Sequence, residues 1–473
     1  MAKPTISGPG RLDAMVANLA GDNITLLLGN GAGGFAAASN SPLSTGDMPE
    51  RLVLGDINND GSVDVVIANF GSDNVTVLLG NGFSTASGSP LGVGDGPFTP
   101  RLGDLNGDGK LDLVVTLSGE DKVKAFLGEG GGGFTLLSSV AVGDDPLGLA
   151  LGDLNGDGIL DLVTTNFLDD NLSVLLGNGS GGFSPAAGAP ISAGNGPFDV
   201  ALGDLNGDGK LDIVALNQLD STVSVFLNTG AGIFASAGPD IPVGNIPNTL
   251  ALGDLNFDGN LDIATANGGD NTVSVLLGNG IGGFSAVAPV NVGASPHGVA
   301  LGDVNNDGKP DIVTANNGPD SGSVFLGNGA GGFAAAGSFG TGLTPSSVAL
   351  GYFDDGFQRM LEDQALIFAT AKGNAITLAD IDAVGPETLT LSVLHGSLVL
   401  ATLAGLTVNS GANGTASLTV TGTLADLNAA LDGLTYLPTG NYNGLDTLNI
   451  QLDDHISGTA STAIAIEIGR AHV

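Results

Sequence analysis

Six stretches of the chain place three aspartates and one asparagine at a fixed spacing, D-x-N-x-D-G-x-x-D. In each stretch side-chain oxygens stand at positions 1, 3, 5 and 9, the position-7 carbonyl can join them, and glycine at position 6 permits a sharp turn. Several carboxylates among hard oxygen donors suit Ca²⁺, whereas Mg²⁺ prefers to keep its waters. The spacing therefore predicts about six structural calcium sites.

The predicted calcium ligands are the four side chains that each stretch supplies. They are Asp56, Asn58, Asp60 and Asp64; Asp104, Asn106, Asp108 and Asp112; Asp153, Asn155, Asp157 and Asp161; Asp204, Asn206, Asp208 and Asp212; Asp254, Asn256, Asp258 and Asp262; and Asp303, Asn305, Asp307 and Asp311. A single copy would be equally compatible with a polar turn whose carboxylates are solvated, and the repetition favours metal. An EF-hand is excluded, because that loop needs glutamate at position 12 and flanking helices.

The elements that position these loops are short strands. The loops recur every 48 to 51 residues, and each unit has four apolar runs bounded by turn residues, as in TLALGD, LDIATAN, NTVSVLLGNG and GGFSAVAPVNVG. Short connections pair such strands antiparallel. Four antiparallel strands at this period are typical of a β-propeller blade, and residues 1–356 are predicted to form seven blades.

The two ends of the repeat region are predicted to share one blade. Residues 10–35 match the second to fourth strands of a unit, and the missing first strand is found at residues 346–351, so the ring has no free edge. A larger ring cut within a blade is the alternative. At this seam Tyr352 and Pro9 replace two of the ligands, which predicts a blade without metal.

These repeats resemble the FG-GAP/VCBS family, best known from the propellers of integrin α subunits. The resemblance rests on the calcium loops, on LGNGxGGF at residues 28–35, 277–284 and 326–333, and on VGxxP turns at residues 93–97 and 292–296. It implies calcium in the first hairpin of a blade and ligand binding on the opposite face. The meander itself puts variable loops such as residues 69–74 and 166–171 on that opposite face, where binding usually lies, although loosely selected solvated loops would look alike.

A second domain is predicted after the repeats, at residues 357–467. Its alternating apolar pattern indicates a β-sandwich, interrupted by a helix that Thr423 caps. The segment resembles the cadherin-like modules of bacterial surface adhesins, which implies calcium at acidic residues near the module ends. The candidates, against solvated surface acids, are Glu362, Asp380, Asp382, Asp453 and Asp454. Residues 468–473 resemble the translation of a sequencing adapter and are predicted to be a non-native tail.

Composition restricts the function further. The net charge of −37 makes nucleic acid and anionic membranes poor partners, and the chain has no cysteine for disulfides. No signal peptide or membrane span is visible in the sequence. The four histidines are scattered and tryptophan is absent, so no catalytic set known from propeller enzymes can be placed. The chain is therefore predicted not to be an enzyme.

The sequence thus predicts an all-β, non-catalytic and calcium-binding module of a secreted or surface bacterial protein. Its expected role is adhesion, or binding of an extracellular protein or glycan on the face opposite the calcium loops. It is expected to be a monomeric part of a larger chain, without direct membrane insertion. Two alternatives remain, an accessory propeller of a secreted polysaccharide-active enzyme and a structural spacer.

Overall fold

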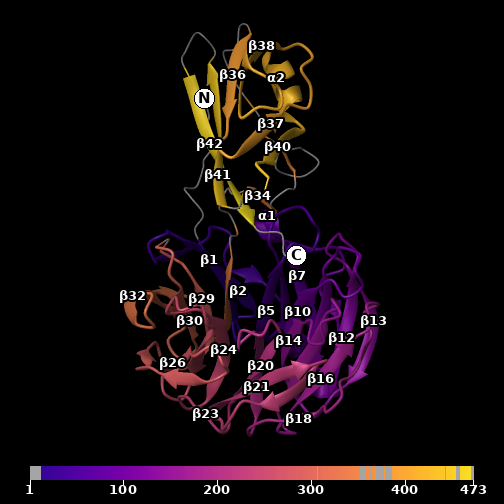
Figure 1. Ribbon diagram of the computed structural model, residues 1–473, viewed down its shortest axis with the longest axis vertical. Helices are drawn as coiled ribbons and strands as arrows, with labels where there is room; N and C mark the ends of the chain where they lie inside the picture. The colour runs from indigo at the N-terminus through magenta and orange to yellow at the C-terminus, as the bar shows by residue number, and fades with distance from the viewer. Residues whose placement is uncertain are drawn as a thin grey trace. The chain divides into compact units, whose positions relative to one another are not determined.

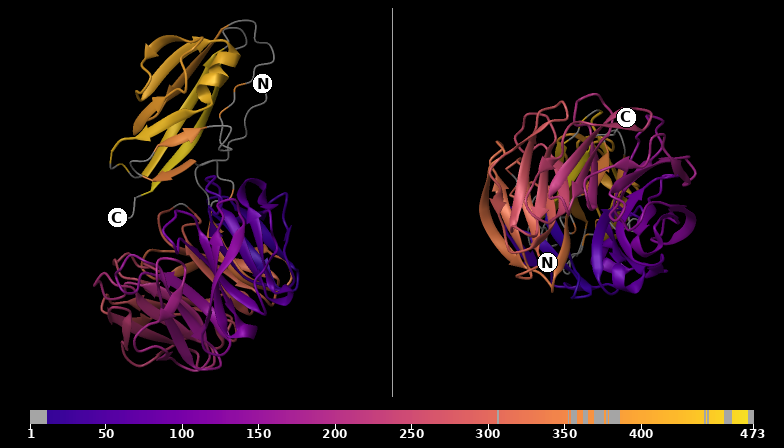
Figure 2. Two further views of the ribbon diagram at one scale, coloured as in Figure 1. Left: turned by 90° about the vertical axis from the view of Figure 1, so that its right-hand side faces the viewer. Right: turned by 90° about the horizontal axis from the view of Figure 1, so that it is seen from below.

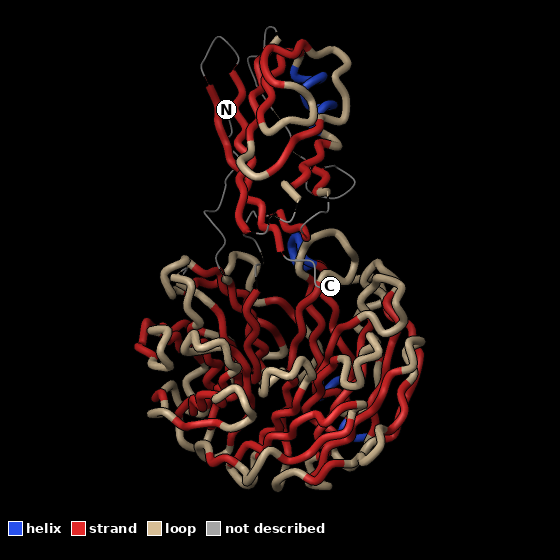
Figure 3. Tube along the Cα trace, in the orientation of Figure 1, coloured by secondary structure: helices blue, strands red, loops and turns tan. Residues whose placement is uncertain are grey.

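The computed structural model describes residues 12–305, 307–351, 353, 358–361, 365–368, 376, 378, 386–440, 442, 444–453 and 459–469. The chain divides into two compact units, one spanning Arg11–Phe353 and the other containing Asp354–Val473 (Figure 1). Strands dominate both units, which confirms the predicted all-β class (Figure 3). Among the described residues, no helix is long and apolar enough to cross a membrane.

In the described residues, the larger unit is a ring of seven antiparallel sheets (Figure 2). The innermost strands are β33 (Pro345–Gly351), β5 (Pro49–Gly55), β10 (Pro97–Gly103), β14 (Pro146–Gly152), β19 (Pro197–Gly203), β24 (Pro247–Gly253) and β29 (Pro296–Gly302). The second strands are β1 (Asp13–Asn18), β6 (Asp64–Asn69), β11 (Asp112–Leu117), β15 (Asp161–Asn166), β20 (Asp212–Asn217), β25 (Asp262–Asn267) and β30 (Asp311–Asn316). The third strands are β2 (Asn23–Gly29), β7 (Asn74–Leu79), β12 (Lys122–Gly128), β16 (Asn171–Gly177), β21 (Thr222–Gly230), β26 (Thr272–Gly278) and β31 (Ser321–Gly327).

Outer strands complete the sheets. They are β3 (Phe35–Ala37), β8 (Ser84–Thr85), β13 (Phe134–Ala141), β17 (Phe183–Pro185), β22 (Ile233–Ser236), β27 (Phe284–Ala286) and β32 (Phe333–Gly340). Short strands that pair with third strands are β4 (Leu43–Ser44), β9 (Leu91–Gly92), β18 (Ile191–Ser192), β23 (Ile241–Pro242) and β28 (Val290–Asn291), and the helical turns are α1 (Gly80–Phe83), η1 (Phe70–Ser72) and η2 (Ser118–Glu120). The predicted seven-bladed propeller is confirmed.

The ring closes between its first and last strands. β33 pairs antiparallel with β1, with Val16 opposite Val348, so one sheet runs β33-β1-β2-β3. Each innermost strand also contacts the next around the ring, in the order β5, β10, β14, β19, β24, β29, β33 and back to β5. Because every sheet has a neighbour on both faces, no blade is left at an edge.

Apolar side chains between neighbouring blades form the core. Every second strand is buried along its whole length. Each pair of adjacent blades shares one cluster of buried side chains, such as Val66, Leu113, Val115 and Phe126 between the β5 and β10 blades. Burial on both faces explains the continuous Val, Leu and Ile runs, because neither face of these strands meets water.

The second unit is a β-sandwich. One sheet has the order β34 (Gln358–Leu361), β42 (Thr459–Gly469), β41 (Gly444–Asp453), β36 (Glu387–Ser392), β39 (Ser417–Gly422) and β38 (Thr407–Gly411); the other has β35 (Leu366–Phe368), β40 (Leu434–Pro438) and β37 (Gly396–Val399). Leu389, Val420, Leu398 and Tyr436 belong to the core that joins them. Helix α2 (Leu424–Leu431) buries Leu427 and Leu431 there, and the hydroxyl of Thr423 accepts the Asp426 N–H, which confirms the predicted cap.

Candidate functional site

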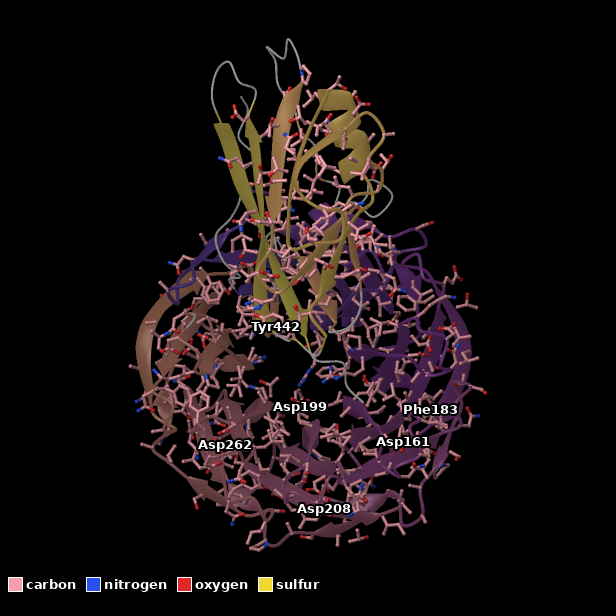
Figure 4. The ribbon with its side chains drawn as sticks, turned by 45° about the horizontal axis from the view of Figure 1, so that its top comes forward. Asp161, Phe183, Asp199, Asp208, Asp262 and Tyr442 are labelled. Carbon is pink, nitrogen blue, oxygen red and sulfur yellow. The ribbon has the colours of Figure 1, made fainter. Side chains whose placement is uncertain are left out.

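The predicted calcium loops all lie at one end of the propeller blades. Each loop joins an innermost strand to the second strand of the same sheet, as Asp104 to Asp112 joins β10 to β11. The innermost strand and the second strand begin to pair directly beside the loop. There the last aspartate of the loop lies opposite the last glycine of the innermost strand, as Asp112 lies opposite Gly103. The meander therefore places all six loops on one face, which we call the loop face. Figure 4 labels Asp161, Asp208 and Asp262, which belong to three of these loops.

The first three ligand positions fold the loop onto its own backbone. The Asp104 carboxylate accepts the N–H groups of Gly107 at 2.7 Å and Gly109 at 2.8 Å. The amide oxygen of Asn106 accepts the N–H of Asp108 at 2.9 Å, and the Asp108 carboxylate accepts that of Lys110 at 2.9 Å. In each of the other five loops, the carboxylate at position 1 accepts the backbone N–H groups of positions 5 and 6, and the carboxylate at position 5 accepts that of position 7. These side chains turn their oxygens toward the interior of the loop.

The aspartate at position 9, the last ligand position, bonds the third strand of the blade as well as the loop. Asp112 is fully buried, and its carboxylate accepts the N–H of Leu105 at 2.9 Å through one oxygen and that of Gly128 at 2.8 Å through the other. It thereby ties the loop to the end of the third strand, β12. Asp64, Asp161, Asp212, Asp262 and Asp311 make the same two kinds of bond.

The seam blade has the same buried aspartate, although its sequence replaces two of the other ligands. Asp13 is 3 % exposed, and its carboxylate accepts the N–H of Gly29 at 2.8 Å and that of Phe353 at 3.1 Å. Tyr352 and Pro9, which replace the ligands there, lie outside the described residues. All seven blades thus share the aspartate bridge, so the bridge has a structural role that requires no complete calcium loop.

The carboxylates of one loop influence each other electrostatically. Burial raises the pKa of Asp112 above its usual range, bonds from Gly128 and Leu105 lower it, and the charges of Asp108 and Asp104 raise it again. In three loops a lysine at position 7 offsets the repulsion between the carboxylates. In one of them the Nζ atom of Lys210 lies 2.7 Å from a carboxylate oxygen of Asp208. Hydrogen bonding by Lys210 lowers the pKa of Asp208. Loops with Ser62, Ile159 or Asn260 at that position have no such counter-ion.

The donor set fits calcium in chemistry, because each loop offers carboxylate and amide oxygens whose negative charges repel one another. Across the described residues, however, no three Asp, Glu, His or Cys side chains converge closely enough to hold a metal ion. Each of these oxygens has a second lone pair, so the oxygens at positions 1, 3 and 5 could contact a cation and keep their bonds to loop N–H groups. The ligand assignments stay a prediction.

Sequence reasoning missed a second group of polar side chains, on the innermost strands. We call Glu50, Arg51, Arg101, Asp199 and His297 the inner-ring cluster. Arg51 on β5 donates to Asp199 on β19 at 2.9 Å and to the carbonyl of Asn248 on β24 at 3.1 Å. Because β5 is not adjacent to β19 or β24, these bonds cross the middle of the ring, where Figure 4 shows Asp199.

Aromatic rings and burial shape the electrostatics of the inner-ring cluster. The Arg51 guanidinium lies 5.6 Å from the ring centre of Phe98 and 5.8 Å from that of Phe198. Burial lowers the pKa of Arg101 to about 10, opposed by the charge of Asp199. Burial also lowers the pKa of His297, and the charge of Arg51 acts in the same direction. For Glu50, burial raises the pKa to about 7, and Arg51 only partly opposes this.

A comparison of the innermost strands within the chain could have revealed the cluster. They read PERLVLG, PFTPRLG, PLGLALG, PFDVALG, PNTLALG, PHGVALG and PSSVALG. The fifth residue is alanine in five strands, so Arg101 stands out, as do Arg51 and Asp199 at the third residue. Their pairing could not be read from the sequence, because it depends on which blades face each other.

We expect Glu50→Gln to stabilise the protein at about pH 8 and to change little at about pH 4. The pKa of Glu50 is raised from 4.5 to about 7, so only the folded state holds this proton between those values. Stability is therefore lost as the pH rises through this window, by up to about 3 kcal/mol. Urea denaturation at both pH values measures the change in the free energy of unfolding that Glu50→Gln causes. Glu120→Gln, which removes a carboxylate paired with Lys122 and Lys124, is the control and should give no gain.

Comparisons with known proteins agree with the propeller. A family model described as FG-GAP-like repeat matches residues 7–67, 56–115, 104–164, 153–215, 204–265, 254–314 and 303–355. No curated protein sequence matches. Similar solved structures include a periplasmic gluconolactonase of Pseudomonas aeruginosa, with 15% identity, a TM-score of 0.55, and coverage of 72% of this chain and 99% of that one.

Two further solved structures give the same fold. A Bacteroides fragilis protein named as a candidate 6-phosphogluconolactonase has 15% identity and a TM-score of 0.57, covering 74% of this chain and 100% of that one. A protein of unknown function from Desulfotomaculum acetoxidans has 12% identity and a TM-score of 0.56, covering 72% and 99%. At these identities the likeness shows the fold alone.

The lactonase names among these neighbours contradict the prediction that the chain is not an enzyme. That prediction rested on missing tryptophan motifs and on scattered histidines. Because propellers of this shape carry hydrolase names, the absence of those particular motifs does not exclude catalysis. The inner-ring cluster of acid, base and guanidinium groups was also invisible to that reasoning.

Proposed function

We propose, from the premise that this chain belongs to the FG-GAP-like repeat family, that it is a calcium-stabilised binding module of a secreted or surface bacterial protein. Its ligand would be an extracellular protein or glycan, bound on the face opposite the loop face. Adhesion is the role that this arrangement supports best.

The difference between the two propeller faces carries the proposal. The loop face repeats nearly the same nine-residue loop six times. The opposite face instead exposes different apolar side chains, among them Leu168 at 67%, Leu219 at 65% and Leu343 at 57%. Met48 and Ile246 are also exposed there. Exposed apolar groups on variable loops of a rigid scaffold are typical of a binding surface.

Calcium has a structural part in this proposal. The cation would neutralise the carboxylates at positions 1 and 5 of each loop, with the asparagine at position 3 and the carbonyl at position 7 as further donors. Each loop joins the innermost and second strands of a blade, so a rigid loop would hold these two strands in their antiparallel pairing. The chain has no cysteine, and we propose that calcium takes the place that disulfides have in other extracellular proteins.

For the C-terminal sandwich we propose a cadherin-like module of the kind found in bacterial adhesins. Its two sheets around one core support a sandwich of this general type. Of the five predicted acidic candidates, Glu362, Asp380, Asp382 and Asp454 lie outside the described residues, as do residues 470–473 of the predicted tail. Calcium binding by this module is an expectation that titration of the full chain can test.

The proposed binding face can be tested with glycan and extracellular-matrix protein arrays in about 1 mM calcium. We expect a ligand whose binding falls at least about tenfold when Leu168→Asp and Leu219→Asp are combined, because each change would bury an unpaired carboxylate in the contact area. Ile281→Asp is the matched control, since this side chain is 74% exposed in a turn on the loop face. Equal losses from both changes, or no ligand on any array, would contradict the proposal.

A further inference from the structure

A cavity of about 290 Å³ lies between the β10 and β14 blades, and we call it the interblade cavity. Its lining includes Val142, just after β13, Asp169 in the turn between β15 and β16, Ser173 and Val174 on β16, and Ala189 in the turn between β17 and β18. Val174 is 1% exposed and Ser173 is 9% exposed. One water takes about 30 Å³ of liquid volume, so the interblade cavity has room for a small organic molecule.

The turn that contains Ala189 occurs in three blades, and the three copies share one backbone geometry. It reads ASNSPL at residues 38–43, ASGSPL at residues 86–91 and AAGAPI at residues 186–191. In every copy the N–H of the fourth residue bonds the carbonyl of the first, and the N–H of the first residue bonds a carbonyl of the third strand. Those third-strand residues are Leu26, Val77 and Val174. The copies therefore differ in their side chains, with serine, serine and alanine as the fourth residue.

The alanine leaves a buried N–H group without a partner. In the first two copies the serine hydroxyl accepts the N–H of the third-strand residue, that of Leu26 at 3.0 Å and that of Val77 at 2.9 Å. Ala189 has no hydroxyl, so the N–H of Val174 has no acceptor among the described residues. Buried backbone N–H groups in proteins nearly always have a partner. The N–H of Val174 therefore indicates an acceptor atom inside the interblade cavity.

Two further polar groups of the cavity have unused hydrogen-bonding capacity. The hydroxyl of Ser173 accepts the Nδ2–H of Asn166 at 3.0 Å, and its own O–H has no acceptor in the described part of the chain. One carboxylate oxygen of Asp169 accepts the N–H of Asp144 at 3.0 Å, and the other oxygen has no described donor. In two other blades an asparagine replaces Asp144 and bonds both oxygens of the equivalent aspartates, Asp220 and Asp270.

These groups suit a neutral molecule that carries hydroxyl groups. The N–H of Val174 and the O–H of Ser173 donate while Asp169 accepts, so the ligand must offer both acceptors and donors. No lysine or arginine is among the described residues that line the cavity, and the net charge of −37 repels anions. Val142 and Leu175 add apolar surface that can contact the C–H groups of a sugar ring.

We propose that the interblade cavity binds one neutral sugar ring. Sugar oxygens accept the N–H of Val174 and the O–H of Ser173, and a sugar hydroxyl donates to the free oxygen of Asp169. This proposal rests on the proposed function and deepens it, because it gives a glycan ligand a defined site at one blade boundary. The two can fail separately. If the arrays find a protein ligand that depends on Leu168 and Leu219 while no sugar binds, only the interblade site is lost.

Isothermal titration of the full chain in about 1 mM calcium tests the site. The probes are D-glucose, D-galactose, D-mannose and L-fucose, and D-glucuronate is the negatively charged comparison. We expect at least one neutral sugar to bind with one site per chain, and more tightly than D-glucuronate. Equal or tighter binding of D-glucuronate, or no binding of a neutral sugar at up to about 10 mM, would overturn the proposal and leave water as the occupant.

Ala189→Ser is the most informative variant, because it gives this turn the serine of the other two copies. The new hydroxyl should accept the N–H of Val174, so the protein should melt higher and bind the sugar about tenfold more weakly. Ala187→Ser is the matched control, since this exposed residue of the same turn does not line the cavity and is serine in the other two copies. It should change neither property.

Ser173→Ala tests the second donor. It should weaken sugar binding several-fold, because the ligand loses one hydrogen bond. Unchanged sugar binding in both Ala189→Ser and Ser173→Ala would refute the assignment of the site.

Discussion

Removal of calcium is expected to lower the melting temperature of the propeller by about 10 °C. With a dissociation constant near ~10⁻⁴ M, ~1 mM calcium stabilises the folded state by about 1.4 kcal/mol per site. Six sites then contribute on the order of 8 kcal/mol, comparable with the total stability of a domain. Without the cation, the charges of Asp104 and Asp108 that raise the pKa of Asp112 are offset only by Lys110, which lies 3.7 Å from the Asp108 carboxylate.

Scanning calorimetry of the full chain in calcium and in EDTA measures this shift, and magnesium at equal concentration is the control. Magnesium should restore little of the stability, because it dehydrates reluctantly. Asp104→Asn should remove about one sixth of the calcium effect, since it changes one of six loops. A melting temperature that EDTA leaves unchanged would defeat the proposed structural role of calcium.

The second large effect concerns the buried aspartate at the end of each loop. Asp112→Ala is expected to destabilise the protein by about 3–5 kcal/mol, because it leaves two buried N–H groups without an acceptor. These are the N–H groups of Leu105 and Gly128. The loss should persist in EDTA, since the bridge to β12 joins protein groups only. Urea denaturation with and without calcium measures the loss of stability and shows whether it depends on calcium.

Two matched variants separate the bridge from metal binding. Asp108→Asn changes an exposed carboxylate at position 5 of the same loop, so it should destabilise by about 1 kcal/mol in calcium and hardly at all in EDTA. Asp13→Ala removes the bridge of the seam blade and should resemble Asp112→Ala. If the effect of Asp112→Ala disappears in EDTA, the last aspartate acts as a calcium ligand alone.

Much of the fold could be predicted because its signals are local. A glycine at position 6 and side-chain acceptors at positions 1, 3 and 5 fold a loop within nine residues, and the structure has these turns in all six copies. The strands between them follow from short Val, Leu and Ile runs bounded by turn residues. The seven blades and the cap at Thr423 were accessible for the same reason.

The roles of individual polar residues were less accessible. The aspartate at position 9 is predicted from the sequence to be a ligand, and the structure adds that it accepts an N–H group sixteen residues further along, as Asp112 does from Gly128. Likewise, the prediction of a chain without catalytic potential depended on known motifs, and neither Glu50 nor Arg101 belongs to one. Sequence spacing says which residue types are present and not which groups they contact across a sheet.

By itself the sequence determined the repeat, the loop spacing and the number of blades, because hydrophobic period and turn chemistry act over a few residues. Only the tertiary structure decided what the ring encloses. Arg51 and Asp199 are 148 residues apart and meet because closure of seven blades brings β5 opposite β19. Burial in that ring then shifts the pKa of Glu50 and Arg101, since desolvation depends on every strand around them.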